Sequence, residues 1–487
     1  MHRALLRTLL TFTTTLTTAS VCFGATYYVS NQGSDKNDGQ SPATAWATLA
    51  RVNAGPLQPG DRVFFRRNDV WRGQLTPHSG SEAGPITYGA YGDPTAPRPR
   101  LLGAAARNNA SDWQNKGGNL WSTTPGAALK VDVGNIIFNH DESCGVKKWS
   151  RNDLHRQGDF WYDASNGTVR VYSINNPASR YSDIELALKG AIIHQGNKSY
   201  VTYQGLDLHY GDYGIAGGNT HHITVSDCDL AFLGGALLYR LKDGTPVRAG
   251  NGIEFWGNAH DCLVERCRLW EIYDAALTNQ NTGAVCQQYN IVYRYNLIWN
   301  CEYSFEYWNR PQASLTHHIY FENNTCLGAG CGWGHSQRPD PAGRHLCFYT
   351  NDCQTHDVYI RNNIFCRATD VAFDALWWKP ETMSDPRVIR LDHNCWLQPE
   401  GQMIRLRGKS YTQAQFAAYQ RDTGQEAHSL TADPHLADPA KLDFHLRPGS
   451  PCLGAGADLG YPADFDRRPI ARGKAPAIGA FERGPQP

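Results

Sequence analysis

Short segments with alternating apolar residues recur through the middle of the chain. They read "VTYQGLDL" from 201, "ITVSDCDL" from 223, "CLVERCRL" from 262, "NIVYRYNL" from 290, "IYFENNTC" from 319, "VYIRNNIF" from 358 and "IRLDHNCW" from 389. Alternation with a period of two is typical of a β-strand. Because the segments recur every 22 to 39 residues with no helical pattern between them, they predict the coils of a solenoid.

The sixth position of each segment forms a candidate internal column. These positions hold Leu206, Cys228, Cys267, Tyr295, Asn324, Asn363 and Asn394. A polar Asn at one bend can bond the Asn of the next coil, so we interpret this column as structural. The pattern predicts an all-β fold, a right-handed parallel β-helix, with its repeats over residues 189–408.

The flanking segments complete a single-domain organisation. Residues 1–25 place basic residues before a threonine-rich apolar run that is too short and too hydroxylated for a membrane span, so they predict a signal peptide and a secreted or periplasmic protein. We expect an N-terminal cap and the first coils over 26–188. Residues 409–487, with the helix-like "SYTQAQFAAYQRDTG", are expected to pack on the coils and close the solenoid.

Three stretches outside the repeats carry a family resemblance. They are "YYVSNQGSDKNDGQSPATAWATLARVN", the strand pair "PGDRVFFRRNDVWRGQL" and the ending "SPCLGAG…IGAFE". With these, nearly all of the chain after residue 25 resembles secreted bacterial proteins with a pectin-lyase-like right-handed parallel β-helix. The resemblance implies a carbohydrate-active protein that acts on a polysaccharide. It does not choose among the lyases, glycosidases, epimerases and esterases that share the architecture.

The composition limits the kinds of binding partner that we expect. The chain has 46 basic and 46 acidic residues, so its charge does not favour nucleic acid. We expect a monomer. Of the 14 cysteines, 13 follow residue 25, and the sequence leaves open whether they are disulfides or small buried residues.

The strand that follows each bend predicts an outward-facing lane. Its inward pairs are Ile253 and Phe255, Ala275 and Leu277, Phe305 and Tyr307, Leu346 and Phe348, Phe373 and Ala375, and Ile404 and Leu406. Alternation then places one outward column at Glu254, Ala276, Glu306, Cys347, Asp374 and Arg405. Two residues earlier, a second column would hold Gly252, Asp274, Ser304 and His345. We therefore expect solvent-facing glutamates with Ala276 between them and Asp274 diagonally beside both.

Four carboxylates in this lane are candidate catalytic residues: Glu306, Asp274, Glu254 and Asp374. The predicted register puts the backbones of Asp274 and Glu306 roughly 8 Å apart. That spacing is compatible with an inverting glycosidase, in which one carboxylic acid protonates the leaving oxygen and a second carboxylate activates water. Mutual repulsion would also raise at least one pKa, as a general acid requires.

Candidate substrate-binding residues accompany the carboxylates. They are Trp256, Trp308, Tyr349, Arg310 and His345 on or beside the strands, and His335 and Arg338 in the long excursion between Cys326 and Cys347. Aromatic faces stack on sugar rings. We expect this excursion and the insertion "GALLYRLKDGTPVRAG" to form the two walls of the lane.

Three functions stay open. A glycoside hydrolase with no required cofactor and no metal is favoured, because the lysine base of many β-helix lyases is missing from the lane. A polysaccharide lyase is the second hypothesis, with Arg310 or a histidine acting on the substrate and Glu254, Asp274 and Glu306 holding Ca²⁺. A non-catalytic glycan-binding β-helix is the third.

Overall fold

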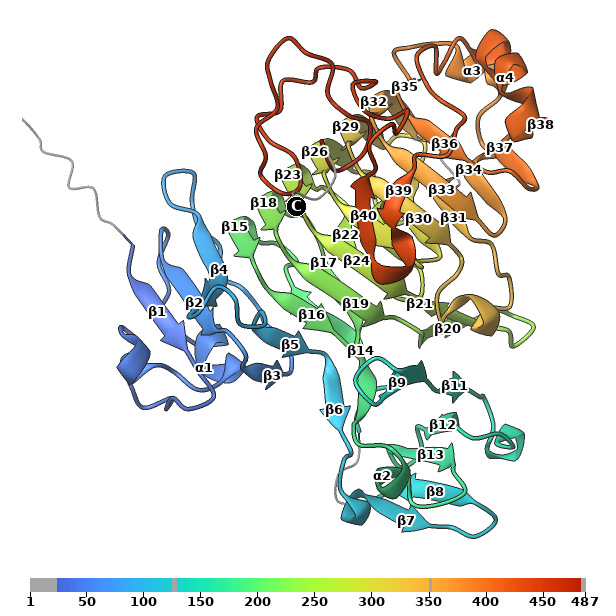
Figure 1. Cartoon of the computed structure of the whole chain (residues 1–487). Coiled ribbons are helices and arrows are strands. Elements are labelled where there is room, and N and C mark those ends of the chain that lie inside the picture. Colours follow the sequence, from blue (N-terminus) through green and yellow to red (C-terminus); the bar gives the residue numbers. More distant parts are fainter. Residues whose placement is uncertain (1–23, 125–128, 350–352, 483–487) are drawn as a thin grey trace, which may run out of the picture.

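Three long sheets run side by side through the molecule (Figure 1). The structure is a computed structural model that describes residues 24–124, 129–349 and 353–482, so residues 1–23 of the predicted signal peptide lie outside it. Each coil contributes one strand to each sheet in the same order, as β23, β24 and β25 do. The chain is therefore a right-handed parallel β-helix, as the repeats predict.

The first sheet has ten parallel strands. They are β1 (Thr26–Val29), β2 (Arg62–Arg66), β4 (Ile86–Tyr91), β15 (Ser199–Gln204), β18 (His221–Ser226), β23 (His260–Glu265), β26 (Gln287–Arg294), β29 (Leu315–Glu322), β32 (Gln354–Arg361) and β35 (Ile389–Asp392). The second sheet has nine: β3 (Val70–Arg72), β5 (Arg100–Leu102), β16 (Asp207–His209), β19 (Asp229–Leu233), β24 (Arg268–Ile272), β27 (Leu297–Trp299), β30 (Thr325–Ala329), β33 (Ile364–Ala368) and β36 (Cys395–Leu397).

The third sheet carries the predicted lane. Its parallel strands are β14 (Ile184–His194), β17 (Gly211–Gly218), β22 (Ile253–Trp256), β25 (Ala275–Asn281), β28 (Tyr303–Asn309), β31 (Arg344–Phe348), β34 (Val371–Ala375) and β37 (Gln402–Leu406). Antiparallel strands extend its two ends: β6 (Ala104–Ala106), β9 (Val133–Phe138) and β10 (Ser143–Cys144) at one end, and β38 (Lys409–Tyr411) at the other.

An asparagine ladder ties the later coils together. Asn324 Nδ2 donates to Asn363 Oδ1 (3.1 Å), and Asn363 Nδ2 donates to Asn394 Oδ1 (3.1 Å), which confirms the predicted column. The coil before them is corrected by one residue: Asn296, not Tyr295, bonds Asn324 (3.0 Å). Tyr295 instead takes a left-handed backbone (φ 53°), so the chain turns there and presents its neighbour to the interior.

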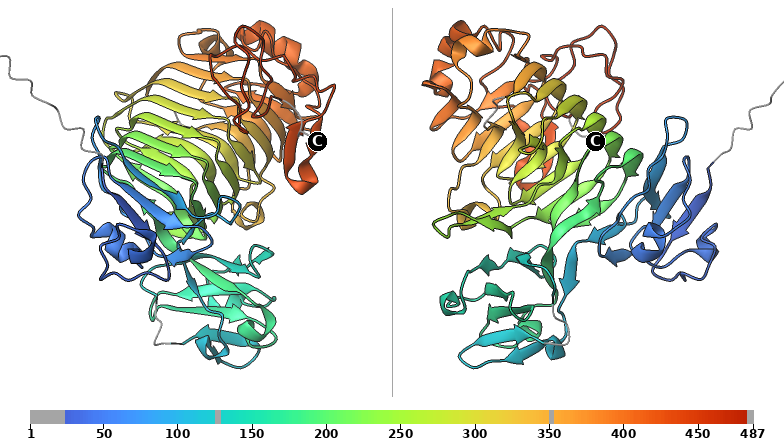
Figure 2. Two further views of the ribbon diagram at one scale, coloured as in Figure 1. Left: turned by 60° about the vertical axis from the view of Figure 1, so that its left-hand side comes forward. Right: turned by 180° about the vertical axis from the view of Figure 1, so that it is seen from behind.

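A separate lobe interrupts the first coils (Figure 2). It contains a five-stranded sheet of β7 (Trp113–Asn115), β8 (Leu120–Thr123), β11 (Val146–Lys147), β12 (Asp159–Asp163) and β13 (Thr168–Tyr172), with the short helix α2 (Pro177–Arg180). Trp113, Phe138 and Phe160 are buried in its own core. The first coils, with α1 (Leu49–Asn53), lie before this lobe.

The C-terminal segment closes the coils in two ways. The predicted helix is confirmed as α4 (Phe416–Thr423), which ends at Gly424 in a left-handed conformation (φ 67°) and buries Phe416 and Tyr419 against the main core beside α3 (Pro380–Met383). The tail, with β39 (Leu436–Asp438) and β40 (Asp443–Leu446), packs on the outer face of the second sheet through Phe444.

Most of the described cysteines are small buried residues. All 13 cysteines of the described residues are free thiols.

None of the helices in the described part of the chain is both long and apolar enough to cross a membrane.

Candidate active site

The strand register places the two glutamates in one outward column, with one correction. Glu254 pairs with Thr278, and Thr278 pairs with Glu306, so Thr278 and not Ala276 lies between the glutamates. The predicted alignment of β25 is wrong by two residues, so Asp274 lies four residues before Thr278 along the strand direction and not diagonally beside the glutamates. The cause of this shift is Asn279, which points inward and accepts a hydrogen bond from the Tyr293 hydroxyl (2.7 Å) at a place where an apolar residue was expected.

The two glutamates of the column line a pocket and do not lie on an open face. The cavity has a volume of about 590 Å³ and is lined by Glu254, Asp274 and Glu306. Glu254 and Glu306 are only 9% and 5% exposed, so the expectation of solvent-facing glutamates is wrong. A volume of this size lies within the range of small-molecule sites.

Two insertions build the walls, as expected. One is the hairpin of β20 (Ala236–Arg240) and β21 (Pro246–Ala249), which brings Leu238, Tyr239 and Leu241 to the pocket. The other is the long excursion after β30, which brings Arg338, Pro339 and Asp340. Both insertions arise between the second and third sheets, so both rise over the same lane.

Glu306 has the most strongly perturbed environment of the column. Burial raises its pKa well above the usual value, the negative charges of Asp274 and Glu254 raise it further, and the charge of Arg338 opposes this rise. Its Oε2 accepts a hydrogen bond from Gln280 Nε2, which lies on the neighbouring strand β25. A buried carboxyl group with acidic neighbours and a neutral amide partner favours the protonated form.

Glu254 is held in a similar way. Asn251 Nδ2 donates to Glu254 Oε2 (2.6 Å), and Asn251 Oδ1 accepts from the backbone N–H of Ala275. This amide therefore links β22 to the start of β25 and fixes the carboxyl group. Burial raises the pKa of Glu254 to about 7, with the Asn251 hydrogen bond opposing the rise and the charge of Asp274 adding to it.

Asp274 reaches the same pocket from the turn before β25. Burial raises its pKa, whereas the guanidinium of Arg338, which donates from Nη1 to Oδ1 at 3.1 Å, opposes that rise. Arg338 also lies near Glu302 (Nε–Oε1 3.6 Å), and Glu302 in turn contacts His335 Nδ1 (3.0 Å). Among the ion pairs of the described residues, Asp274 is the one of the three carboxylates that is paired directly with a cation.

Aromatic side chains flank the carboxylates. Trp256, Gln280 and Trp308 form the next outward column of the sheet. The Trp308 ring lies 5.4 Å from that of Tyr349, and the Arg310 guanidinium lies 5.1 Å from the Trp308 ring centre. All four predicted residues, Trp256, Trp308, Tyr349 and Arg310, line the pocket.

Three predicted residues lie elsewhere. Asp374 is in the predicted column but is ion-paired with Arg344 and Arg405, both at 2.8 Å, and does not line the pocket. His345 points into the interior, where its Nδ1 contacts Ser304 Oγ (3.0 Å) and its ring lies 5.7 Å from that of Phe365. His335 supports the wall through Glu302 but does not line the cavity.

The sequence pattern did not predict several residues that line the pocket. They are Tyr213, Arg248, Asn251, Tyr273, Gln280 and Tyr303. Burial raises the pKa of Tyr213, and the charges of Asp212 and of all three pocket carboxylates raise it further. Gln280 would have been found with the correct register, because it then shares a column with Trp256 and Trp308; the others carry no repeat signal.

Comparisons with known proteins give distant likenesses only. No protein-family model matches the chain, and no curated protein matches it. Among solved structures, pectate lyase Pel9A is similar over 96% of this chain and 98% of its own, with 12% identity and a TM-score of 0.47. A structure described as XylC with xylose is similar over 94% of this chain and 98% of its own, with 11% identity and a TM-score of 0.42.

A lacto-N-biosidase from Eubacterium ramulus, described as GH136, is also similar. The likeness covers 84% of this chain and 67% of that enzyme, at 14% identity and a TM-score of 0.36. These neighbours include a lyase and a glycosidase. With TM-scores below 0.5 they do not bear on the reaction, so the function must be argued from the pocket itself.

Proposed function

We propose that the pocket is the active site of a secreted glycoside hydrolase that acts on a polysaccharide or an oligosaccharide derived from one. The observation that carries this proposal is the convergence of Glu254, Asp274 and Glu306 in one cavity beside the tryptophan column. Paired carboxyl groups of opposite protonation state are what hydrolysis of a glycosidic bond needs.

The environments suggest different roles for the carboxyl groups. The raised pKa of Glu306 favours its protonated form, and no cation is among the hydrogen-bond partners described for it, so it suits the general acid that protonates the leaving glycosidic oxygen. Asp274 is stabilised as a carboxylate by Arg338, so it suits the base that takes a proton from the attacking water. Glu254, whose own pKa is about 7, raises the pKa of Glu306 further in its ionised form.

The aromatic column would bind the sugar. Trp256 and Trp308 lie on the same outward column two strands apart, about 9.6 Å between backbones, with the polar Gln280 between them. Two ring faces on one column can stack on two sugar units of the same chain. Arg310 adds a positive charge beside Trp308.

The lyase hypothesis has weaker support from the same residues. No lysine occurs among the described residues that line the cavity. Three groups of potential ligands in the described chain bring all their ligand atoms within 4.8 Å of one another, and the three pocket carboxylates are not one of them. A calcium-assisted lyase would therefore need a rearrangement of the pocket.

The test is incubation of the purified protein with a panel of neutral and acidic polysaccharides. New reducing ends without ultraviolet absorbance of an unsaturated product support hydrolysis. Reducing ends with that absorbance identify a lyase, and binding without either product identifies a glycan-binding protein. The anomeric configuration of the first product, followed by NMR, then separates inversion from retention.

A further inference from the structure

A column of stacked rings follows one edge of the first sheet, on residues that do not line the pocket. It consists of His221, His260, Tyr289, His317 and His356, one from each of five successive strands. Neighbouring rings are nearly parallel, with centroids 4.7 to 5.1 Å apart. The stacking follows from the strand spacing of a parallel sheet.

The residue after each ring has a left-handed backbone. These residues are His222 (φ 54°), Asp261 (φ 53°), Asn290 (φ 53°), His318 (φ 54°) and Asp357 (φ 55°). In every coil these residues fall outside the residue pairs of the parallel strands. A left-handed residue interrupts the alternation of side chains, which brings its side chain beside the ring column instead of on the opposite face.

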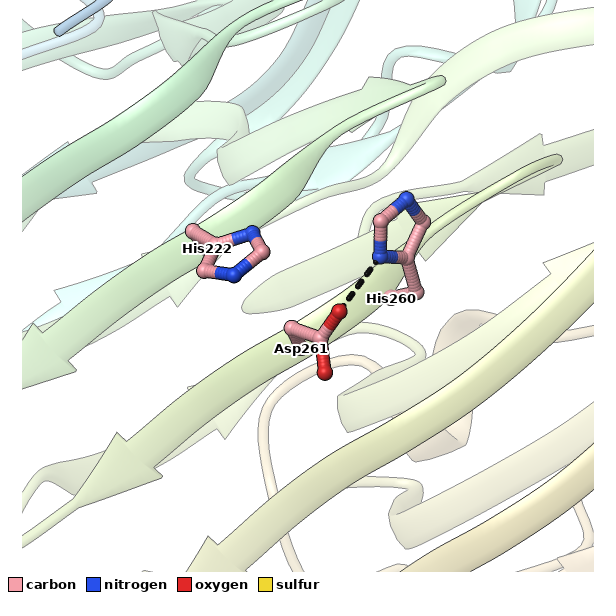
Figure 3. A group of neighbouring side chains, drawn as sticks. All are labelled: His222, His260 and Asp261. Carbon is pink, nitrogen blue, oxygen red and sulfur yellow. Dashed lines mark hydrogen bonds and ion pairs between the residues drawn. The ribbon is translucent and has the colours of Figure 1, made fainter. Parts of the chain in front are cut away.

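At two places, residues of the two columns form a group of two histidines and one aspartate. His222 of β18 faces His260 and Asp261 of β23 (Figure 3), and His318 of β29 faces His356 and Asp357 of β32. In each group the three ligand atoms lie within 4.8 Å of one another. The coil between them has Tyr289 and Asn290, which supply no such group.

We propose that each of these two triads binds one divalent transition-metal ion, with Zn²⁺ as the best match. Two imidazole nitrogens and one carboxylate oxygen are ligands that Zn²⁺ accepts, and three protein ligands leave a position for water. Bonds of about 2.0 to 2.2 Å require ligand atoms to approach to about 3.5 Å, so the side chains move by roughly an ångström.

The triads are accessible to an ion from solvent. The side chains of His260 and Asp261 are 25% and 31% exposed, and those of His356 and Asp357 are 42% and 29% exposed. In each pair, Nδ1 of the histidine lies 2.7 Å from the aspartate oxygen, and the metal replaces the proton that these two atoms share. That proton leaves to solvent.

Each ion would join two adjacent coils. The lone histidine comes from one strand and the histidine–aspartate pair from the next, so separating the strands breaks the site. A ligand that binds only the folded chain raises its stability. The triads therefore act as metal clamps on the first sheet, independent of the chemistry in the pocket.

The test is the number of Zn²⁺ ions retained by the full chain, prepared without a histidine tag, in equilibrium dialysis. His222→Asn and His318→Asn should each lose one equivalent, and the double variant should lose two. Asparagine is the matched substitution because Asn290 already occupies this left-handed column. His194→Ala, an exposed histidine on β14, is the control and should lose none.

Two further readouts keep the result decisive. The melting temperature of the parent should rise with Zn²⁺ and rise less in the double variant, whereas Ca²⁺, which prefers oxygen ligands, should have no such effect. Asp392, His393 and His428 form another candidate group, whose contribution is constant across these variants. Unchanged stoichiometry in the double variant, or equal retention of Ca²⁺, would overturn the proposal.

Discussion

Glu306 and Asp374 occupy the same outward column of the third sheet, with Cys347 between them, yet their surroundings are opposite. Both are buried, at 5% and 3% exposure. Glu306 has a neutral amide as hydrogen-bond partner, and its charged neighbours are two carboxylates opposed by the charge of Arg338, whereas Asp374 is directly ion-paired with two arginines. Equal positions in a repeat therefore do not imply equal chemistry, because the neighbours from loops and adjacent coils set the charge state.

The largest expected effect is on Glu306. Glu306→Gln keeps the shape and removes the ionisable group, so turnover should fall by about a hundredfold or more while folding is retained. Steady-state rates on the substrate found in the panel measure this. The matched control is Asp374→Asn in the same column, which should keep near-parent turnover; equal losses in both variants would contradict the distinction.

Glu254 should make stability depend on pH. Its pKa is about 7 in the folded chain against 4.5 when unfolded, so the folded state holds this proton more tightly. The stabilisation is complete below pH 4.5 and is lost as pH rises through 7, by about 3 kcal/mol. Glu254→Gln should remove that slope in denaturant unfolding measured from pH 4 to 8. A difference between parent and variant that does not change with pH would be evidence against a buried, protonated Glu254.

Asp374 should matter for stability rather than for turnover. Asp374→Ala leaves Arg344 and Arg405 with Asp370 as their remaining acidic partner, so the free energy of unfolding should drop by about 2 kcal/mol. Chemical denaturation measures this change. Asp385 forms an exposed ion pair with Arg387, so Asp385→Ala is the control and should change the free energy of unfolding by close to zero. If Asp374→Ala keeps its stability but loses activity, Asp374 must instead be assigned to the active site.

The smallest expected effect is on the aromatic column. Trp308→Ala should weaken substrate binding by about 1 kcal/mol, roughly fivefold, because a stacking face is lost. Calorimetric titration with the inactive Glu306→Gln variant as background measures binding without turnover. Trp377→Ala, an exposed tryptophan outside the pocket lining, should leave affinity unchanged. Equal effects of the two substitutions would remove the reason to assign Trp308 to the sugar.

Alternation and repetition alone determined the solenoid. The Asn324, Asn363 and Asn394 column, the outward direction of Glu254 and Glu306, and the two insertions as walls all follow from local periodicity, because strand side chains alternate faces wherever the backbone stays regular. Trp256, Trp308 and Tyr349 were found in the same way.

Only the tertiary structure decided what departs from that regularity. An inward Asn279 shifted β25 by two residues, and a break in the pairing at Ser304 and His345 turned that histidine into the core. Arg338, from a loop more than sixty residues along the chain, became the partner of Asp274. Such contacts depend on loop paths and buried hydrogen bonds between distant segments, which leave no period in the sequence. Burial and these partners then set the pKa values, so the sequence supplied the candidate carboxylates and the fold assigned their charge.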